Sequence, residues 1–278
     1  MANTWTKDVE QFRLYENWQD KTKEAYLYDK NDDGSCTCRL CPRKCKITNG
    51  RTGFCKVRKN IDGTLYALSY GKATHVTIEK IETEATFHYK PGADIFSLGN
   101  FGCNLDCKYC QNWKYSQFQY TSPADIREYT SEEIIEMALK NNIKILSWTY
   151  NDPAVWYEFV VDTARLAKKH GIVSLFKSAY YLSEEAVKEL IEVCDIFAVS
   201  IKAMDEEYYH DFTMGTLRPV LNAAKMIYAS GKHLEISNLV VTDLTNNDES
   251  YMKMINFIKN ELDEKIPLHF TRFHPDYK

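Results

Sequence analysis

The stretch GCNLDCKYCQN, residues 102–112, carries three cysteines, Cys103, Cys107 and Cys110, in the spacing C-x3-C-x2-C. A structural zinc site is closed by four protein ligands. Three thiolates at this spacing suit three irons of a [4Fe–4S] cluster, and they leave the fourth iron open to a substrate or cofactor. A zinc site that takes its fourth ligand from elsewhere in the chain is the alternative interpretation.

From residue 94 onward, strand-like runs alternate with amphipathic helices. Six such units with continuous apolar strands predict a parallel sheet covered by helices, and six units are too few for a closed eight-stranded barrel. We therefore expect an α/β fold, a partial (β/α)6 barrel with an N-terminal Cys-rich segment. The expected strands span residues 94–100, 143–149, 172–176, 195–201, 234–241 and 267–273.

The helices are expected from the spacing of apolar residues and from signals at their ends. Thr130 and Glu133 form a capping box, Ser183 caps a later helix, and Pro219 opens another. The helical segments span 131–142, 153–169, the residues after Ser183, 219–231 and 248–262. Their expected inward residues are Ile134, Ile135, Ala138, Leu139, Val155, Phe159, Val160, Val187, Leu190, Ile191, Met254, Ile255 and Ile258.

The N-terminal part, residues 1–93, is expected to hold a helical lead-in, a Cys-rich metal-binding knot and short strands, and residues 94–278 the barrel. The net charge of −4 argues against a nucleic-acid partner, and no apolar run is long enough to span a membrane. The polar N-terminus has no secretory h-region, so we expect a cytoplasmic protein with reduced thiols. Its nine cysteines then indicate metal ligands, except Cys194, which lies in an apolar stretch and is expected in the core.

Ligands of parallel α/β sheets bind at the carboxyl ends of the strands, on the loops that follow them. The three-cysteine loop directly follows the expected strand 94–100, so it lies at that edge. Spacing and position therefore both favour an open cluster site over a closed zinc site.

Several motifs together resemble a known family. Cys103-x3-Cys107-x-Tyr109-Cys110 resembles the motif of the radical S-adenosylmethionine (radical SAM) superfamily, in which an aromatic residue often precedes the third cysteine. The stretches CRLCPRKCKITNGRTGFCKVRKNIDG, YKPGADIFSLGNFGCNLDCKYCQNWKYSQ, TYNDPAVWYEF and PLHFTRFHPDYK resemble the radical SAM enzyme of the AmmeMemoRadiSam system. That family is related to pyruvate formate-lyase activating enzyme, and the resemblance covers roughly residues 36–278.

The resemblance implies a specific chemistry. S-adenosylmethionine (SAM) would bind the open iron through its amino and carboxylate groups. An electron from the reduced cluster would cleave it to methionine and a 5′-deoxyadenosyl radical, which abstracts hydrogen from the substrate. The protein orients the cofactor and excludes water. A reducing partner such as flavodoxin or ferredoxin is implied as well.

Residues after later strands are candidates for binding SAM. Tyr150-Asn151-Asp152-Pro153 stands where relatives carry Tyr-x-Glu-Pro, and a helix start at this Asp-Pro pair is the alternative. KSAYY replaces an Asn-Gly element of relatives, and Ser200-Ile201-Lys202 stands where they show Asp-x-Lys. An unpaired lysine is costly to bury, so a SAM carboxylate or an acid such as Asp205 would have to pair with Lys202. The candidate SAM-binding residues are Tyr109, Asn151, Asp152, Ser178, Ser200, Lys202 and His274.

A second group of cysteines precedes the barrel. The family pattern aligns with Cys38, Cys41, Cys45 and Cys55, which could hold zinc in a tetrahedral site or an auxiliary Fe–S cluster. A set of unliganded reduced thiols is the alternative. Cys36 is a spare thiol that could substitute for one of the four.

The sequence leaves three function classes. We expect a radical SAM enzyme that acts on a protein or peptide, as a glycyl-radical activase does. Relatives usually continue past HPDYK, and without such a cover the barrel mouth would be wide enough for a large substrate. The alternatives are a radical SAM enzyme that acts on a small metabolite and a non-catalytic Fe–S or zinc binding module.

Overall fold

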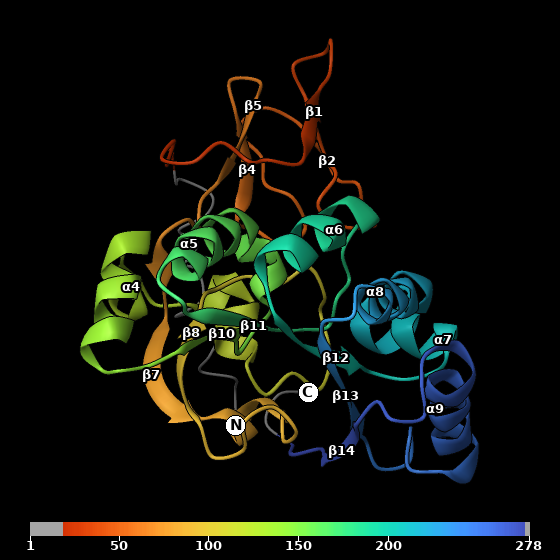
Figure 1. Cartoon of the computed structure of the whole chain (residues 1–278). Helices are drawn as coiled ribbons and strands as arrows, with labels where there is room; N and C mark the ends of the chain where they lie inside the picture. Colours follow the sequence, from red (N-terminus) through yellow and green to blue (C-terminus); the bar gives the residue numbers. More distant parts are fainter. Residues whose placement is uncertain (1–18, 276–278) are drawn as a thin grey trace, which may run out of the picture.

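A seven-stranded sheet forms the centre of the molecule (Figure 1). The structure is a computed structural model that describes residues 19–275, so most of the expected helical lead-in lies outside the described residues. Six of the strands are parallel, and β7 pairs antiparallel with β8 at one edge. In spatial order the strands are β14 (Leu268–Arg272), β13 (His233–Val240), β12 (Ile196–Ile201), β11 (Val173–Ser178), β10 (Ile145–Thr149), β8 (Asp94–Gly99) and β7 (His75–Lys80).

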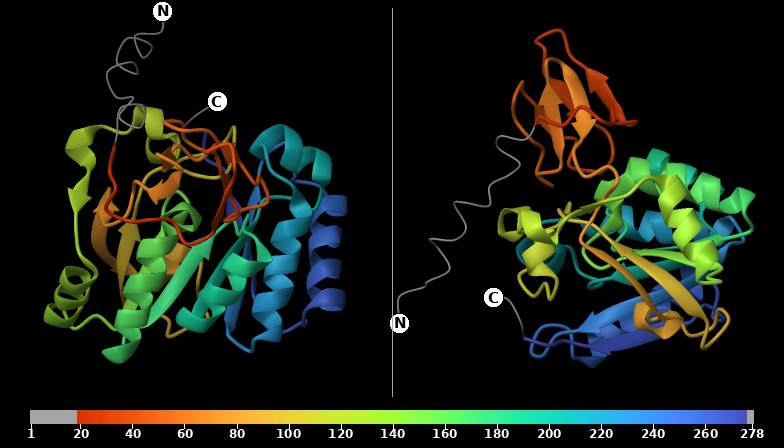
Figure 2. Two further views of the ribbon diagram at one scale, coloured as in Figure 1. Left: turned by 90° about the horizontal axis from the view of Figure 1, so that it is seen from above. Right: turned by 90° about the vertical axis from the view of Figure 1, so that its left-hand side faces the viewer.

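The connecting helices cover the outer face of the curled sheet (Figure 2). This arrangement confirms the expected partial barrel, because the six parallel strands come from the six expected segments and the sheet does not close on itself. The helices and helical turns are η2 (Ile81–Glu84), α3 (Trp113–Ser116), η3 (Phe118–Tyr120), η4 (Pro123–Asp125), α4 (Ser131–Lys140), η5 (Pro153–Trp156), α5 (Tyr157–Lys169), α6 (Glu184–Val193), α7 (Glu206–Tyr208), η6 (Tyr209–Thr213), α8 (Leu217–Ala229) and α9 (Asp248–Glu261).

The ends of the helices follow local hydrogen bonds. The capping box at α4 is confirmed, because the Thr130 hydroxyl accepts from the Glu133 backbone and the Glu133 carboxylate accepts from the Thr130 backbone. The Ser183 hydroxyl caps α6. Pro219 does not open α8, which begins two residues earlier at Leu217.

The prediction that Leu139 and Ile255 point inward is wrong. Leu139 and Ile255 are 40% and 41% exposed. In α9 the buried residues are Met254, Phe257 and Ile258, an i, i+3, i+4 set, and Ile255 lies outside that stripe. Leu139 lies in the last turn of α4, beside the end of the helix.

The N-terminal part consists of short antiparallel strands. Arg58 on β4 forms an ion pair with Glu158 on α5, with 2.9 Å between Nη2 and Oε1, and both side chains are only 1% exposed. This pair joins the N-terminal part to the barrel. The strands are β1 (Tyr28–Lys30), β2 (Cys36–Cys38), β3 (Lys46–Ile47), β4 (Arg58–Ile61), β5 (Thr64–Ala67) and β6 (Lys72–Ala73), of which β6 pairs with β9 (Arg127–Glu128).

The main sheet begins before residue 94, where the sequence predicted the division between the two parts, because β7 belongs to it. The connector that follows β7, residues 81–93, packs against the inner face of the sheet. Ile81 and Tyr89 of the connector lie in one apolar cluster with Ile95, Ile145 and Leu175.

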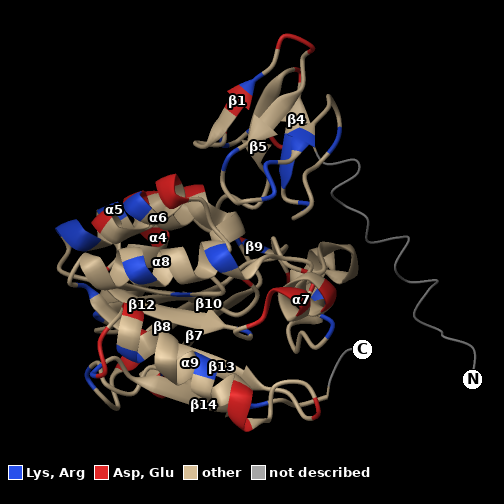
Figure 3. Ribbon diagram, turned by 90° about the vertical axis from the view of Figure 1, so that its right-hand side faces the viewer, with Lys and Arg blue, Asp and Glu red and all other residues tan. Residues whose placement is uncertain are grey.

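Positions of both charge signs are spread over the outward helices, although α8 carries only Lys and Arg positions (Figure 3). Within residues 19–275, no helix combines the length and the apolar character that a membrane crossing needs.

Candidate functional site

The three-cysteine loop leaves β8 at the carboxyl edge of the sheet, as expected. Gly102 begins it with φ +82°, and a Cβ atom at this position would lie 2.7 Å from the carbonyl oxygen of Cys55. Both the backbone angle and this close approach require glycine. The backbone N–H groups of Asp106 and Lys108 donate to the carbonyl oxygens of Thr213 and Phe212, which fix the loop against the end of η6.

The three thiols line one cavity of about 500 Å³. Cys103 Sγ accepts from the Leu105 backbone N–H at 3.4 Å, and Cys110 Sγ lies 3.3 Å from the Ser116 hydroxyl. Burial raises the pKa of Cys107 to about 12 and that of Cys103 well above its ordinary value. The thiolate form therefore needs a bound metal to stabilise its charge.

All seven candidate SAM-binding residues line the same cavity. They come from the loops and ends of β10, β11, β12 and β14 and from the cluster loop itself, so segments far apart in sequence meet at one edge of the sheet. They are Tyr109, Asn151, Asp152, Ser178, Ser200, Lys202 and His274.

Two of these residues have polar atoms without a protein partner. Asn151 donates from Nδ2 to the Gly102 carbonyl, but among residues 19–275 its buried Oδ1 has no donor. The Lys202 ammonium likewise lies within 4 Å of no carboxylate in the described part of the chain. Asp205, the alternative partner, instead caps α7 by accepting from the Tyr208 N–H at 2.8 Å. An unpaired acceptor and an unpaired cation beside three thiols fit the amino and carboxylate groups of an amino acid ligand.

Comparison with known proteins agrees with this geometry. A model of the radical SAM superfamily matches residues 99–258. An uncharacterized protein of Methanocaldococcus jannaschii is 40% identical over 258 residues, which make up 92% of this chain and 76% of that protein. The pyruvate formate-lyase-activating enzyme of Streptococcus mutans is 22% identical over 57% of this chain and 63% of its own length.

Among solved structures, native anSMEcpe with bound AdoMet has a TM-score of 0.50 and 20% identity, over 63% of this chain and 50% of that chain. This likeness shows the fold. This chain belongs to the radical SAM superfamily.

Membership of the radical SAM superfamily implies a [4Fe–4S] cluster and SAM. The residues present fit both groups. Three half-buried thiols and no fourth cysteine line the cavity in the part of the chain that the structure describes, and Asn151 Oδ1 and Lys202 supply the unpaired polar atoms.

Both carboxylate oxygens of Asp152 already accept hydrogen bonds from within the protein. Its Oδ1 accepts from the Ala154 N–H at 3.0 Å and from the Ser178 hydroxyl at 2.7 Å, and its Oδ2 accepts from the Ala179 N–H at 3.0 Å. Burial raises the pKa of Asp152, and the bond from Ser178 opposes this rise. Asp152 thus starts η5 and ties the loop after β10 to the end of β11, while a direct contact with SAM stays a prediction.

Lys177 and Glu84 also line the cavity wall. Lys177 belongs to the KSAYY stretch, where the sequence predicts that Lys177 and Ser178 could face SAM, whereas Glu84 is not singled out by the sequence. Lys177 Nζ lies 3.1 Å from the Ser237 hydroxyl and has no carboxylate within 4 Å among the described residues. Glu84 is 3% exposed and accepts from the hydroxyls of Ser147 and Thr149. The position of Lys177 in the cavity wall agrees with that expectation, but nothing local places Glu84 inside the barrel.

The four N-terminal cysteines lie near one another, since the charges of Cys38 and Cys45 act on Cys41 and those of Cys38 and Cys41 act on Cys55. Cys38, Cys41 and Cys55 are buried, and Cys45 is half-buried. Burial raises the pKa of Cys41 and of Cys55 to about 12. A second metal held by these four thiols stays a prediction.

Proposed function

We propose that this chain reductively cleaves SAM and abstracts hydrogen from a protein or peptide, as glycyl-radical activases do. The observation that carries the proposal is the convergence of three half-buried thiols, Lys202 and the unpaired Asn151 Oδ1 on one cavity. When bound, a [4Fe–4S] cluster supplies the electron that cleaves SAM to methionine and a 5′-deoxyadenosyl radical.

The other roles at the site, holding the cluster and binding SAM, would fall to separate side chains. Cys103, Cys107 and Cys110 would hold the cluster, and Lys202 would pair with the methionine carboxylate of SAM. Asn151 Oδ1 would accept from the methionine amino group. The buried wall of the cavity limits the water that reaches the reacting atoms.

A protein or peptide substrate is supported by where the cavity opens. Its lining includes Glu79 of β7 and Thr83 of η2 on one side, and Thr271 and Phe273 at and after β14 on the other. The strands β7 and β14 are the two edges of the sheet, so the cavity reaches the lateral gap of the partial barrel. An extended segment could enter there. The relative that activates pyruvate formate-lyase acts on a protein, which supports the same class.

The test is anaerobic reconstitution with iron, sulfide, reductant and SAM, followed by measurement of 5′-deoxyadenosine. Wild type should form it, and Cys107→Ala should not. Cys194→Ala is the matched control, because Cys194 is buried outside the cavity. Undiminished 5′-deoxyadenosine from Cys107→Ala would exclude the proposed site, and its absence from wild type would favour a non-catalytic metal-binding module.

One observation favours a small anionic metabolite as the second candidate. Lys177 presents a cation without a carboxylate partner to the same cavity, beside Ser200 and Ser237. Deuterium transfer into 5′-deoxyadenosine separates the candidates, since a labelled peptide or glycyl-radical enzyme should transfer it in the first case and a labelled carboxylic acid in the second.

We propose a reducing compartment, the cytoplasm, for this chemistry, because all nine cysteines are unpaired. A flavodoxin or ferredoxin would then be the electron donor. Reduction of the reconstituted protein by either of these two, measured by loss of cluster absorbance, tests this part of the proposal.

A further inference from the structure

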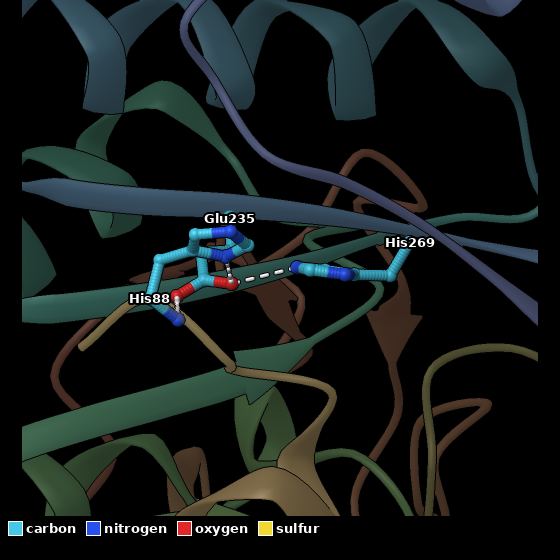
Figure 4. A group of neighbouring side chains, drawn as sticks. All are labelled: His88, Glu235 and His269. Atoms are coloured by element: carbon cyan, nitrogen blue, oxygen red, sulfur yellow. Dashed lines mark hydrogen bonds and ion pairs between the residues drawn. The ribbon is translucent and has the colours of Figure 1, made fainter. Parts of the chain in front are cut away.

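A group of three side chains lies at the end of the barrel opposite the cysteines. Glu235 is on β13, His269 is on β14, and His88 is on the connector between η2 and β8 (Figure 4). Leu239, which lines the cysteine cavity, follows four residues after Glu235, or about 13 Å along the strand. None of the three side chains lines that cavity, so this His–Glu–His group forms a site separate from the cysteine cavity.

The ligand-type atoms of the group converge. His88 Nδ1, one Glu235 carboxylate oxygen and His269 Nε2 all lie within 4.8 Å of one another. Glu235 Oε2 is 2.6 Å from His269 Nε2 and 3.2 Å from His88 Nδ1. Neighbouring ligands of an octahedral ion with bonds of about 2.1 Å lie about 3.0 Å apart, so these two separations already match a metal site to within a few tenths of an ångström.

The carboxylate is held in place by further donors. The backbone N–H groups of Phe87 and His88 donate to Glu235 at 3.0 and 2.9 Å, and His233 Nε2 lies 2.8 Å from its Oε1. Two backbone N–H groups and three imidazole nitrogens thus surround this one carboxylate and fix its position. His233 contacts Oε1, whereas the ring nitrogens of His88 and His269 contact Oε2. An outer residue that orients a metal ligand occupies such a position.

We propose that His88, Glu235 and His269 bind one divalent first-row transition ion, of the zinc or ferrous iron kind. Two imidazoles and one carboxylate form a borderline N/O ligand set that suits these ions, whereas Ca²⁺ and Mg²⁺ prefer oxygen ligands. Glu235 is 1% exposed and His269 14%, but His88 is 59% exposed, so the ion has a path from solvent. On binding, the proton of each ligating ring nitrogen moves through water to the other nitrogen of that ring.

The position of the group indicates what the ion would do. The connector leaves β7 and enters β8 at one edge of the sheet, yet Phe87 and His88 contact β13 and β14 at the opposite edge. Figure 2 shows this segment against the last two strands. The ion would therefore tie the two edges of the partial barrel together at the end away from the cysteines. This inference is independent of the proposed function.

The test uses the full chain with its iron–sulfur cluster reconstituted and loosely bound metal removed by a chelator. Anaerobic titration with Zn²⁺, and separately with Fe²⁺, should show one equivalent more bound by wild type than by His88→Ala. Glu235→Gln should lose the same equivalent, and His233→Asn should weaken it by about tenfold. His210→Ala is the control, because His210 is exposed and its only carboxylate partner in the described chain is Asp211.

Two further measurements make the outcome decisive. Zinc X-ray absorption should show nitrogen and oxygen ligands for the equivalent that His88→Ala lacks, which separates it from zinc on cysteine sulfur. Amide exchange at Phe87 and His88 should slow when the ion is added to wild type. The His88 side chain is exposed, so its substitution leaves the core intact. Equal binding by wild type, His88→Ala and Glu235→Gln would overturn the proposal and leave Glu235 as a carboxylate held by hydrogen bonds alone.

Discussion

Arg43 of the Cys-rich N-terminal part donates from Nε to the backbone carbonyl oxygen of Asn104, 2.7 Å away. That carbonyl lies between Cys103 and Cys107, so the cation contacts the cluster loop itself. The same guanidinium donates to the Met214 carbonyl and lies 3.6 Å from the centre of the Phe54 ring. The Arg43 side chain thus joins the Cys-rich N-terminal part, the cluster loop and the turn after η6.

We expect Arg43→Lys to loosen the cluster loop, because lysine lacks the planar fork that serves two carbonyls and stacks on Phe54. Reconstituted protein should hold less iron and show altered electron paramagnetic resonance of the reduced cluster. SAM cleavage should fall roughly tenfold, as about 1.4 kcal/mol of lost positioning would produce. Arg39→Lys is the control, since Arg39 pairs with Asp29 and Glu185 away from the loop. Equal iron content and spectra in both variants would show that Arg43 is not a positioning residue.

Lys202→Met should weaken SAM binding without loss of the cluster. The substitution keeps the length of the side chain and removes a charge that no described carboxylate neutralises, so a bound carboxylate loses its partner. We expect the dissociation constant for SAM to rise at least tenfold in equilibrium dialysis at constant iron content. Lys114→Met, an exposed lysine outside the cavity, is the control. An unchanged dissociation constant would assign Lys202 a structural role.

The sequence predicted the barrel well because its signals are local. Six apolar runs followed by amphipathic helices determine six β/α units, and the capping box at Thr130 marks a helix start within four residues. The C-x3-C-x2-C loop lies at the carboxyl edge for the same reason, since it directly follows β8.

Long-range contacts account for what the sequence did not show. The strand β7 joins the main sheet as its antiparallel edge, although its sequence resembles the short strands before it. Glu84 lies inside the barrel because the connector after β7 turns inward, and it accepts from Ser147 and Thr149 more than 60 positions away. His88 and Glu235 are 147 positions apart. No local pattern links such residues.

Lys177 predicts a pH dependence of stability. Burial lowers its pKa to about 8 from 10.5, although the charge of Glu84 opposes the shift. Between these values the unfolded chain binds a proton that the folded chain does not, so the free energy of unfolding rises with pH across this window. The free energy of unfolding of wild type, minus that of Lys177→Met, should rise by up to about 3 kcal/mol from pH 7 to pH 10. Guanidinium chloride unfolding of both reduced apoproteins at the two pH values measures this rise. If the two unfolding free energies differ by the same amount at both pH values, the lowered pKa of Lys177 is contradicted.

The buried pair between Arg58 and Glu158 should be essential to stability. Glu158→Gln leaves a fully buried guanidinium without its counter-charge, which costs about 3–5 kcal/mol. The exposed pair between Lys225 and Glu261 is the matched control, and Glu261→Gln should cost less than about 1 kcal/mol. Denaturant unfolding of both variants provides the comparison, and similar midpoints would contradict the prediction.

The four N-terminal cysteines should bind a second metal that stabilises residues 36–60. Cys41 and Cys55 are buried with raised pKa values, so their thiolates need a cation, and Arg58 near Cys55 already pairs with Glu158. This part of the chain is built of strands of two to four residues, which gain little from packing among themselves. A metal would supply the missing stabilisation, whether zinc or iron of an auxiliary cluster.

A variant with Cys103, Cys107 and Cys110 all replaced by Ala isolates this second site. Its metal content should approach one zinc, or one cluster equivalent of iron, and adding His88→Ala removes any contribution from the His–Glu–His group. Changing Cys41 to Ala as well should then release the metal and expose residues 36–60 to protease, because three thiols no longer close a tetrahedral site. Cys36→Ala, a buried cysteine outside the four, should leave both unchanged. If the triple variant holds neither metal yet keeps a protease-resistant N-terminal part, the four cysteines pack as free thiols and the second site does not exist.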